Sequence, residues 1–373
     1  MKIAMSSPVY FPDVNGEAVY VNQLSTGLVK RGHEVEIFVP HSKRTSLVRA
    51  HYRGGYKDFE TSNGITVRRF NTKNVKDKYR YSYPMLKALI RSDADIIHSH
   101  HFGYYPATAG FIAAKMKRLP HVFGPYYHPP IYGISKKIIF AAYHITQGIP
   151  LLRVSDRVLP HTEYEKKMLL KVRARSDNME LLPNIVDTKL FKPKKKKENI
   201  VLFVSHLIPT KGPDIALDIA KQILLERKDV KFIFIGAGRM ENELKEKAAK
   251  IDKKRITFMK DLSVKQLIDT YSKSKVMILP SYYEAFGKVL AESMACETPV
   301  VSTHVGGVPE VVSDCGFLTN YGDWKLFKNY IEILLDDNNL RKRLGKKGRK
   351  RMQKNFDIEV IVDKLDGIYR SVI

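Results

Sequence analysis

Two glutamates, Glu284 and Glu292, lie on either side of a predicted junction between a loop and a helix. The apolar run 276–279 predicts a buried strand before the loop, and residues 289–295 predict the helix after it. In open parallel α/β sheets, ligands bind at the carboxyl ends of the strands, where such a loop lies. A helix that begins there offers its backbone N–H groups to a phosphate. Two carboxylates beside an anion site are costly unless they bind hydroxyl groups. A sugar joined to a ribose through a diphosphate has hydroxyl groups at both ends and negative charge in the middle. We therefore expect a ligand of this kind.

The elements that must position these acids alternate between strand and helix along the whole chain. Strand-like segments at 2–6 and 35–39 precede a lysine-rich stretch, and others at 200–205 and 231–235 follow it. This alternation predicts an α/β protein with two Rossmann-like, doubly wound parallel-sheet domains facing across a cleft, where ligands are expected to bind.

The expected boundaries follow from the same alternation. Residues 1–190 form a predicted amino-terminal domain on the acceptor side, and residues 198–355 a predicted nucleotide-sugar-binding domain. Residues 356–373 come after both sheets are complete, so we expect this last helix to pack back on the first domain.

Basic residues exceed acidic ones by 25 among the 373 residues. Such an excess favours anionic partners: nucleic acid, an anionic membrane surface or phosphorylated substrates. The basic residues gather in two runs, at 192–197 and 341–351. Solvated helix and linker faces are the favoured interpretation of these runs, and a membrane surface is the alternative. We expect no nucleic-acid partner, because no recognisable nucleic-acid module accompanies the charge.

The two cysteines, Cys296 and Cys315, do not form a C-x-x-C pair. A disulfide framework or zinc site is therefore not expected, and a reducing compartment is. The sequence begins without a signal-peptide pattern and contains no apolar stretch of membrane-spanning length. We expect a cytoplasmic protein, with peripheral attachment to the inner face of the cell membrane left open.

Further candidate residues follow other predicted strands. Gly236 and Gly238 end one strand, but Glu241 occupies the position of the third glycine of a dinucleotide fingerprint, so no nicotinamide or flavin cofactor is expected. These glycines indicate either a tight turn or close approach of a nucleotide. Lys211 can neutralise a phosphate as a point charge. Gly16 is either a turn glycine or a place where a diphosphate or acceptor rests on the backbone.

Histidines also gather near predicted strand ends. His98, His100 and His101 have no carboxylate or cysteine at ligand spacing, so we do not expect them to bind a metal. We expect them to be polar residues that line the carboxyl edge of a sheet. His128 follows Pro125 and precedes two more prolines, and such a rigid loop positions a side chain well. A purely structural histidine is the alternative at this position.

Taken together, these residues resemble the retaining glycosyltransferases of family 4, which have the two-domain GT-B fold. Glu284 and Glu292 match the family's E-x7-E pair. Other matching segments in the carboxyl half are 280–281, 286–287, 292–296, 298–301 and 306–310. In the amino half they are 31–35, 95–100 and 182–184.

The resemblance implies a nucleotide-sugar donor held mainly by the second domain. Glu292 would bind ribose hydroxyls, and Glu284 would bind donor-sugar hydroxyls together with the backbone of the following residues. Lys211 and the helix start would stabilise the leaving diphosphate, so no metal is expected to be required. The implied catalytic residues are His128, Lys211 and Glu284. The implied donor-binding residues are Gly16, His206, Lys211, Gly236, Gly238, Glu284, Phe286, Gly287, Lys288, Val289 and Glu292.

The sequence departs from the family pattern at His206, where an arginine is usual, and at Asn15, where a glycine is usual. The leading hypothesis is transfer of a hexose or N-acetylhexosamine to a hydroxyl acceptor, with a lipid or lipid-linked acceptor favoured by the charge. A nucleotide-sugar epimerase is one alternative. The other is a scaffold that binds sugar nucleotides or glycans and has lost activity through His206.

Overall fold

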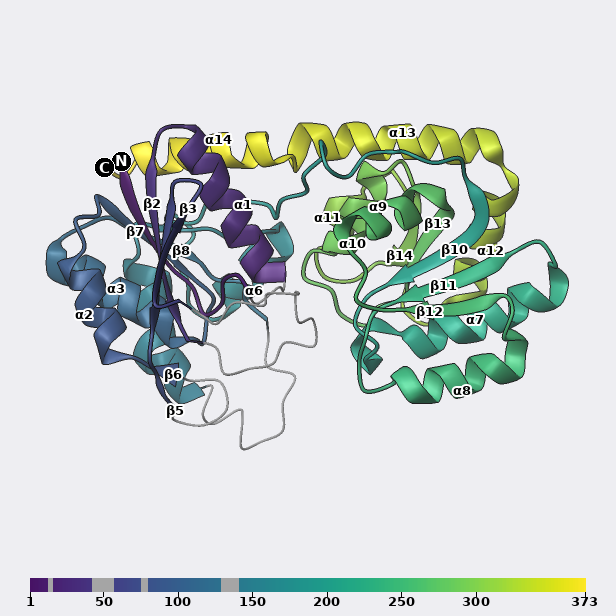
Figure 1. Ribbon diagram of the computed structural model, residues 1–373, viewed down its shortest axis with the longest axis horizontal. Helices are drawn as coiled ribbons and strands as arrows, with labels where there is room; N and C mark the ends of the chain where they lie inside the picture. The colour runs from purple at the N-terminus through teal and green to yellow at the C-terminus, as the bar shows by residue number, and fades with distance from the viewer. Residues whose placement is uncertain (13–15, 42–56, 75–79, 129–140) are drawn as a thin grey trace. The chain divides into compact units, whose positions relative to one another are not determined.

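A computed structural model describes residues 1–12, 16–41, 57–74, 80–128 and 141–373 (Figure 1). The chain divides into two compact units. Unit 1 comprises Met1–Asn184 with Ile358–Ile373, and unit 2 comprises Ile185–Asp357. Each unit has its own parallel sheet with helices on both faces, which is the predicted fold class. Asn15 lies outside the described residues.

Unit 1 is built on a seven-stranded sheet with the order β3-β4-β2-β1-β7-β8-β9, in which β3 alone pairs antiparallel with its neighbour. The strands are β1 (Lys2–Ser6), β2 (Glu34–Pro40), β3 (Phe59–Ser62), β4 (Ile65–Phe70), β7 (Ile96–His100), β8 (His121–Gly124) and β9 (Arg157–Val158). A separate ribbon pairs β5 (Lys73–Asn74) with β6 (Arg80–Tyr81). Because β2 and β7 flank β1, the winding of the sheet reverses between β1 and β7, where such sheets bind ligands.

Helices cover both faces of this sheet. They are α1 (Gly16–Lys30), α2 (Tyr83–Arg91), α3 (Tyr105–Lys117), the π-helix η1 (His144–Gly148), α5 (Ile149–Val154), α6 (Glu163–Lys171) and α14 (Ile358–Arg370). The last helix, α14, packs against α1 within unit 1. A Cβ added at Gly27 of α1 would lie 2.5 Å from Val362 of α14, and the Arg31 guanidinium binds the Asp363 carboxylate at 2.6 Å.

Unit 2 is built on six parallel strands with the order β12-β11-β10-β13-β14-β15. They are β10 (Glu198–Val204), β11 (Lys231–Ile235), β12 (Ile256–Met259), β13 (Ser274–Leu279), β14 (Val300–Thr303) and β15 (Phe317–Thr319). The central strands β10 and β13 are apolar after their first two residues, because helices cover both faces of the sheet. The winding of the sheet reverses between β10 and β13.

The helical elements of unit 2 are η2 (Pro209–Lys211), α7 (Pro213–Glu226), α8 (Glu241–Asp252), α9 (Val264–Lys273), α10 (Lys288–Ala295), α11 (Val308–Val312), α12 (Trp324–Asp336) and α13 (Asn338–Asn355). The capping box predicted at the start of α9 is present, with Ser263 and Gln266 exchanging side-chain and backbone hydrogen bonds. Within the described ranges, no helix combines the length and apolar character needed to span a bilayer.

The first basic run is only partly the solvated linker that the sequence predicts. Lys192, Lys194, Lys195 and Lys196 are exposed. Lys197 instead donates a hydrogen bond to the Thr298 hydroxyl, and burial lowers the pKa of Lys197 to about 7. Its position directly before β10 draws its side chain inward, so the expectation of a solvated face is wrong for this residue.

Candidate functional site

An ion pair joins two predicted site residues at the carboxyl edge of the unit 2 sheet. The Lys211 ammonium lies 2.6 Å from Oε2 of Glu284, and the two side chains are only 19% and 16% exposed. Lys211 follows β10, and Glu284 lies in the loop after β13. These neighbouring strands flank the point where the winding reverses, so the pair lies where open parallel sheets bind their ligands.

The loop that carries Glu284 is held in place by Gly306 and Gly307. A Cβ on Gly306 would lie 1.8 Å from the Glu284 carbonyl oxygen, and Gly306 has a φ of +55°. The Gly307 N–H donates a hydrogen bond to the same oxygen at 3.1 Å. Because Gly306 has no side chain, the loop after β14 can pack directly against the Glu284 backbone and hold it in place.

The loop that carries Lys211 is fixed in a similar way. Gly212 has a φ of +63°, and a Cβ there would lie 2.3 Å from the Pro280 carbonyl oxygen. The Tyr282 N–H donates to the Thr210 carbonyl oxygen at 3.0 Å. The loops after β10 and β13 are thus joined by backbone contacts, which set the distance between Lys211 and Glu284.

Glu292 lies just over one turn inside α10, and its carboxylate accepts a hydrogen bond from the Tyr271 hydroxyl at 3.0 Å. Burial raises the pKa of Glu292, and the Lys288 ammonium and the Tyr271 hydrogen bond oppose that shift. Burial also lowers the pKa of Lys288. A carboxylate with few partners in a poorly solvated place gains most from hydroxyl donors. Tyr271 was missed from the sequence because it belongs to a separate helix, α9, and no motif marks it.

The start of α10 lies beside the loop that carries Glu284, since a Cβ on Gly287 would lie 3.5 Å from Cγ of Glu284. Gly287 is the N-cap residue with a φ of +84°, and no side chain caps the helix. The Phe286 ring is buried and packs edge to face on Phe356, with ring centres 5.6 Å apart. Val289 is half-buried. The positive end of the α10 dipole therefore faces the same edge as Lys211.

Gly236 and Gly238 allow the loop after β11 to pack against the loop after β10. A Cβ on Gly236 would lie 1.9 Å from the Ser205 carbonyl oxygen, and one on Gly238 would lie 2.3 Å from the Leu207 carbonyl oxygen. His206, between these contacts, has an exposed side chain. What the structure shows at these glycines is close packing between the two loops, which leaves no room for a side chain. Contact of these glycines with a nucleotide stays a prediction.

The two remaining site candidates, Gly16 and His128, belong to unit 1. Gly16 is the first residue of α1, and a Cβ there would meet open space. His128 is exposed in the loop after β8. The structure thus gathers Lys211, Glu284 and Glu292 with the start of α10 on one sheet edge, and it places Gly16 and His128 at the carboxyl edge of the other sheet.

Glu17, next to Gly16, is a largely enclosed acid, 12% exposed, that the sequence reasoning missed. Its carboxylate accepts a hydrogen bond from the Ser7 hydroxyl at 3.3 Å and lies 3.9 Å from Nε2 of His101. Burial raises the pKa of Glu17 to about 8. His101 has a φ of +73°, which is strained for a residue with a side chain. Glu17 follows β1 and His101 follows β7, so they meet where the winding of this sheet reverses.

The buried histidines of β7 have structural partners. His98 and the Tyr369 hydroxyl share a hydrogen bond of 2.6 Å, and His100 and the Tyr126 hydroxyl share one of 3.1 Å. Burial lowers the pKa of His98 to about 3, so its ring is neutral. In the part of the chain that the structure describes, no group of three or more histidine, cysteine or acidic side chains is arranged to hold a metal ion.

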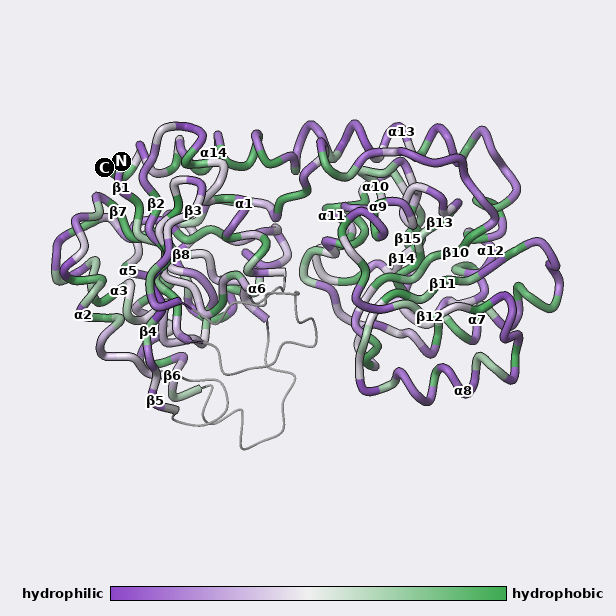
Figure 2. Tube along the Cα trace, viewed as in Figure 1, coloured by the Kyte–Doolittle hydropathy of each residue, from purple (hydrophilic) through white to green (hydrophobic). Residues whose placement is uncertain are grey.

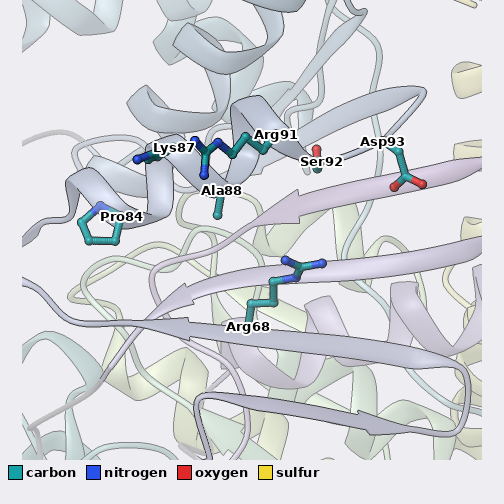
Figure 3. Close-up of a pocket in the computed structure, with 7 residues that line it drawn as sticks. All are labelled: Arg68, Pro84, Lys87, Ala88, Arg91, Ser92 and Asp93. Carbon is teal, nitrogen blue, oxygen red and sulfur yellow. The ribbon is translucent and has the colours of Figure 1, made fainter.

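A cavity of about 660 Å³ in unit 1 is a competing candidate site (Figure 3). Its lining residues are Arg68, Pro84, Lys87, Ala88, Arg91, Ser92 and Asp93. They belong to β4, α2 and the turn after α2. Arg91 is the last residue of α2, where the helix dipole disfavours an anion. Three lining side chains are cationic and one, Asp93, is acidic, so the lining can attract an anion. The unit 2 edge combines Lys211 and the start of α10 with two carboxylates for sugar hydroxyls, and no such pair of acids is among the residues that line this cavity.

Two family models match the chain and between them cover both units. Residues 14–190 match the model described as Glycosyltransferase Family 4, and residues 186–351 match the model described as Glycosyl transferases group 1. The chain belongs to glycosyltransferase family 4. It is therefore a glycosyltransferase, and the E-x7-E pair identified from the sequence lies within the second matched segment.

Similar proteins support this assignment over the full chain. An uncharacterized glycosyltransferase of Methanocaldococcus jannaschii is 28% identical, with 100% of this chain and 99% of the relative covered. The GPI3 subunit of phosphatidylinositol N-acetylglucosaminyltransferase from Saccharomyces cerevisiae is 24% identical over 83% of this chain and 69% of the relative. The crystal structure of Anabaena Alr3699/HepE in complex with UDP and glucose covers all of both chains, with a TM-score of 0.76 and 18% identity, and shares the fold.

Proposed function

We propose that this glycosyltransferase moves a hexose or N-acetylhexosamine from a nucleotide sugar to a hydroxyl acceptor, with retention of anomeric configuration. The observation that carries the proposal is the Lys211–Glu284 pair, held 2.6 Å apart beside the start of α10. A cation, a helix amino terminus and two carboxylates on one edge match the groups of a diphosphate-linked sugar: Lys211 and α10 face the phosphates, and the acids face hydroxyls.

The proposed donor contacts follow the order of these groups along the edge. Glu292 binds the ribose hydroxyls, which supply the donors that its enclosed carboxylate lacks. Glu284 and the backbone of Phe286–Lys288 bind the hydroxyls of the sugar. When the donor is bound, the Lys211 ammonium contacts both the Glu284 carboxylate and the diphosphate. His206, Gly236 and Gly238 belong to the adjoining loops and complete the donor site.

The proposed chemistry needs no metal, since Lys211 and the N–H groups of α10 stabilise the negative charge that develops on the diphosphate. The bond between the anomeric carbon and the phosphate oxygen breaks as the acceptor oxygen bonds to the same face of that carbon. The proton of the acceptor hydroxyl passes to the departing phosphate oxygen. His128 and Gly16, from unit 1, are proposed to act on the reacting sugar and on the acceptor.

A lipid or lipid-linked acceptor forms part of the proposal. The relative from Saccharomyces cerevisiae is named a phosphatidylinositol N-acetylglucosaminyltransferase subunit, and HepE was crystallised with UDP and glucose. Those names describe the relatives. They support a UDP-sugar as the first donor to test here and a phospholipid as the first acceptor.

The test combines purified protein, a panel of UDP-, GDP- and ADP-linked hexoses and N-acetylhexosamines, and phosphatidylinositol or native lipid extract. Mass spectrometry should find a product one sugar heavier, and NMR coupling constants should show the donor's anomeric configuration retained. Glu284→Gln should abolish the product. The matched control is Glu226→Gln, which breaks an ion pair with Lys328 on the surface of unit 2. Failure of the protein to bind any nucleotide sugar in calorimetry would overturn the proposal, and an inverted product would overturn retention.

A further inference from the structure

The helix α13 carries the second basic run, and its charge is extreme. Nine of its 18 residues are lysine or arginine, and none is acidic. Figure 2 shows it as one of the most hydrophilic helices of unit 2. Like charges three or four residues apart repel and destabilise a helix, so this sequence requires a compensating interaction.

Three arginines of α13 face inward, which corrects the expectation of a uniformly solvated face. Arg341 is buried and donates to the Leu334 carbonyl oxygen at 2.7 Å. Arg349 donates to the carbonyl oxygen of Ala295, the last residue of α10, at 2.5 Å. Arg351 reaches the carbonyl oxygens of α11. Each guanidinium thus serves a helix end that lacks backbone partners, and together they fix α13 to the domain.

The other six basic residues of α13 face outward and are exposed. They are Lys342, Arg343, Lys346, Lys347, Lys350 and Lys354. Their spacing of three, four and seven residues places them on one face, which extends roughly 18 Å along the helix at about 1.5 Å per residue. Lys347 pairs with Asp314. Across the described ranges, no acidic side chain lies within 4.0 Å of the other five, so their charge is compensated by no residue there.

We propose that this cationic face of α13 binds the surface of a membrane rich in anionic phospholipids. Five of the six exposed cations are lysines, whose flexible stems and point charges suit mobile headgroups. The face presents no large apolar side chain and no aromatic ring, so it fits electrostatic attachment without insertion into the bilayer. Sequence-reading surfaces for nucleic acid use arginine forks and aromatic stacking, and this face has one arginine and no ring.

This inference deepens the lipid part of the proposed function, because a membrane-attached enzyme meets a lipid acceptor at its own surface. It does not depend on the donor chemistry. Vesicle binding and nucleotide-sugar binding are separate measurements, so either idea can fail while the other stands.

The test is sedimentation of the full-length protein with vesicles of pure phosphatidylcholine or of phosphatidylcholine with 30% phosphatidylglycerol, a composition chosen to resemble an anionic leaflet. The triple variant Lys342→Gln, Lys346→Gln and Lys350→Gln removes three charges that have no partner. Its matched control replaces three exposed lysines of the α7–α8 side, Lys221, Lys228 and Lys254, by glutamine. Figure 1 shows α7 and α8 on the side of unit 2 away from α13. Far-ultraviolet circular dichroism checks that each variant is folded.

The wild type should sediment with the anionic vesicles only, and binding should weaken steeply with salt. Each lysine near an anionic surface contributes about fivefold, so the α13 variant should bind about 100-fold more weakly. The control should stay within a few-fold of the wild type. Equal loss in both triple variants, equal binding to neutral vesicles, or an α13 variant that binds like the wild type would overturn the proposal. So would α13-dependent retention of duplex DNA without vesicle binding.

Discussion

Replacing Gly306 by alanine should disturb Glu284 without touching any side chain of the candidate site. The new Cβ would lie 1.8 Å from the Glu284 carbonyl oxygen. Since carbon and oxygen atoms pack at about 3.4 Å or more, the two backbone segments must separate by roughly 1.6 Å. Left-handed backbone with a side chain costs about 1–2 kcal/mol, and overpacking adds about 1–3 kcal/mol. The free energy of unfolding of unit 2 should therefore fall by about 2–5 kcal/mol.

A glycine with the same sign of φ supplies the control. Gly322 has a φ of +100°, and a Cβ there meets nothing within 4 Å. Gly322→Ala should thus cost only the backbone strain, about 1–2 kcal/mol. Because +100° lies further from the left-handed minimum than +55° does, strain alone would make the control the more damaging change. The collision with Glu284 predicts the opposite order.

The assay is urea unfolding followed by the fluorescence of Trp324, the single tryptophan, which lies in unit 2. A displacement of more than 1 Å near a reacting group costs about 100-fold in kcat/KM for the best donor of the panel. Gly322→Ala should stay within a few-fold of wild type. If the two alanine variants unfold at the same urea concentration and turn over donor equally, the account of how Glu284 is positioned is wrong.

Three further predictions concern single side chains. Glu17 has a folded pKa of about 8, above its ordinary value, so wild-type stability should fall as pH rises from about 4.5 to 8. Glu17→Gln should remove that fall. The prediction is wrong if thermal unfolding shows the same difference in stability between this variant and the wild type at pH 6 and at pH 9. His206→Arg adds a permanent cation near Lys211 and should tighten UDP binding in calorimetry by about 3–10-fold; unchanged or weaker binding refutes this. Tyr271→Phe removes the hydroxyl that Glu292 accepts from. It should lower the stability of unit 2 by about 1–3 kcal/mol and weaken uridine binding, whereas unaltered binding would argue against Glu292 as the ribose ligand.

The sequence predicts the central strands of both sheets well, because their apolar runs are covered by helices on both faces, but it does not predict the edge strands β3 and β15. The central strand of unit 1, Lys2–Ser6, begins and ends as predicted. The helix Tyr105–Lys117 was not predicted, because its small residues give almost no apolar stripe to recognise. The secondary structure of such a segment depends on contacts with residues far away in the sequence, and a local sequence pattern does not reveal those contacts.

The candidate site divides in the same way. Glu284 and Glu292 could be found because both lie in one short segment. Their partners Lys211 and Tyr271 come from other loops and helices, so only the strand order brings them together. The roles of the glycines could be assigned only from the structure. In the sequence, a glycine that forms a turn looks the same as one that contacts a ligand or makes room for a neighbouring carbonyl group. Gly306 serves the carbonyl of Glu284.

The central claim is that the carboxyl edge of the unit 2 sheet holds an activated sugar, and a crystal structure of the protein with a nucleotide sugar tests it most directly. We predict the diphosphate at the start of α10 beside Lys211, the ribose on Glu292 and the sugar on Glu284. Density for the ligand in the cavity between α2 and β4, or with neither carboxylate within hydrogen-bonding distance of it, would contradict the account.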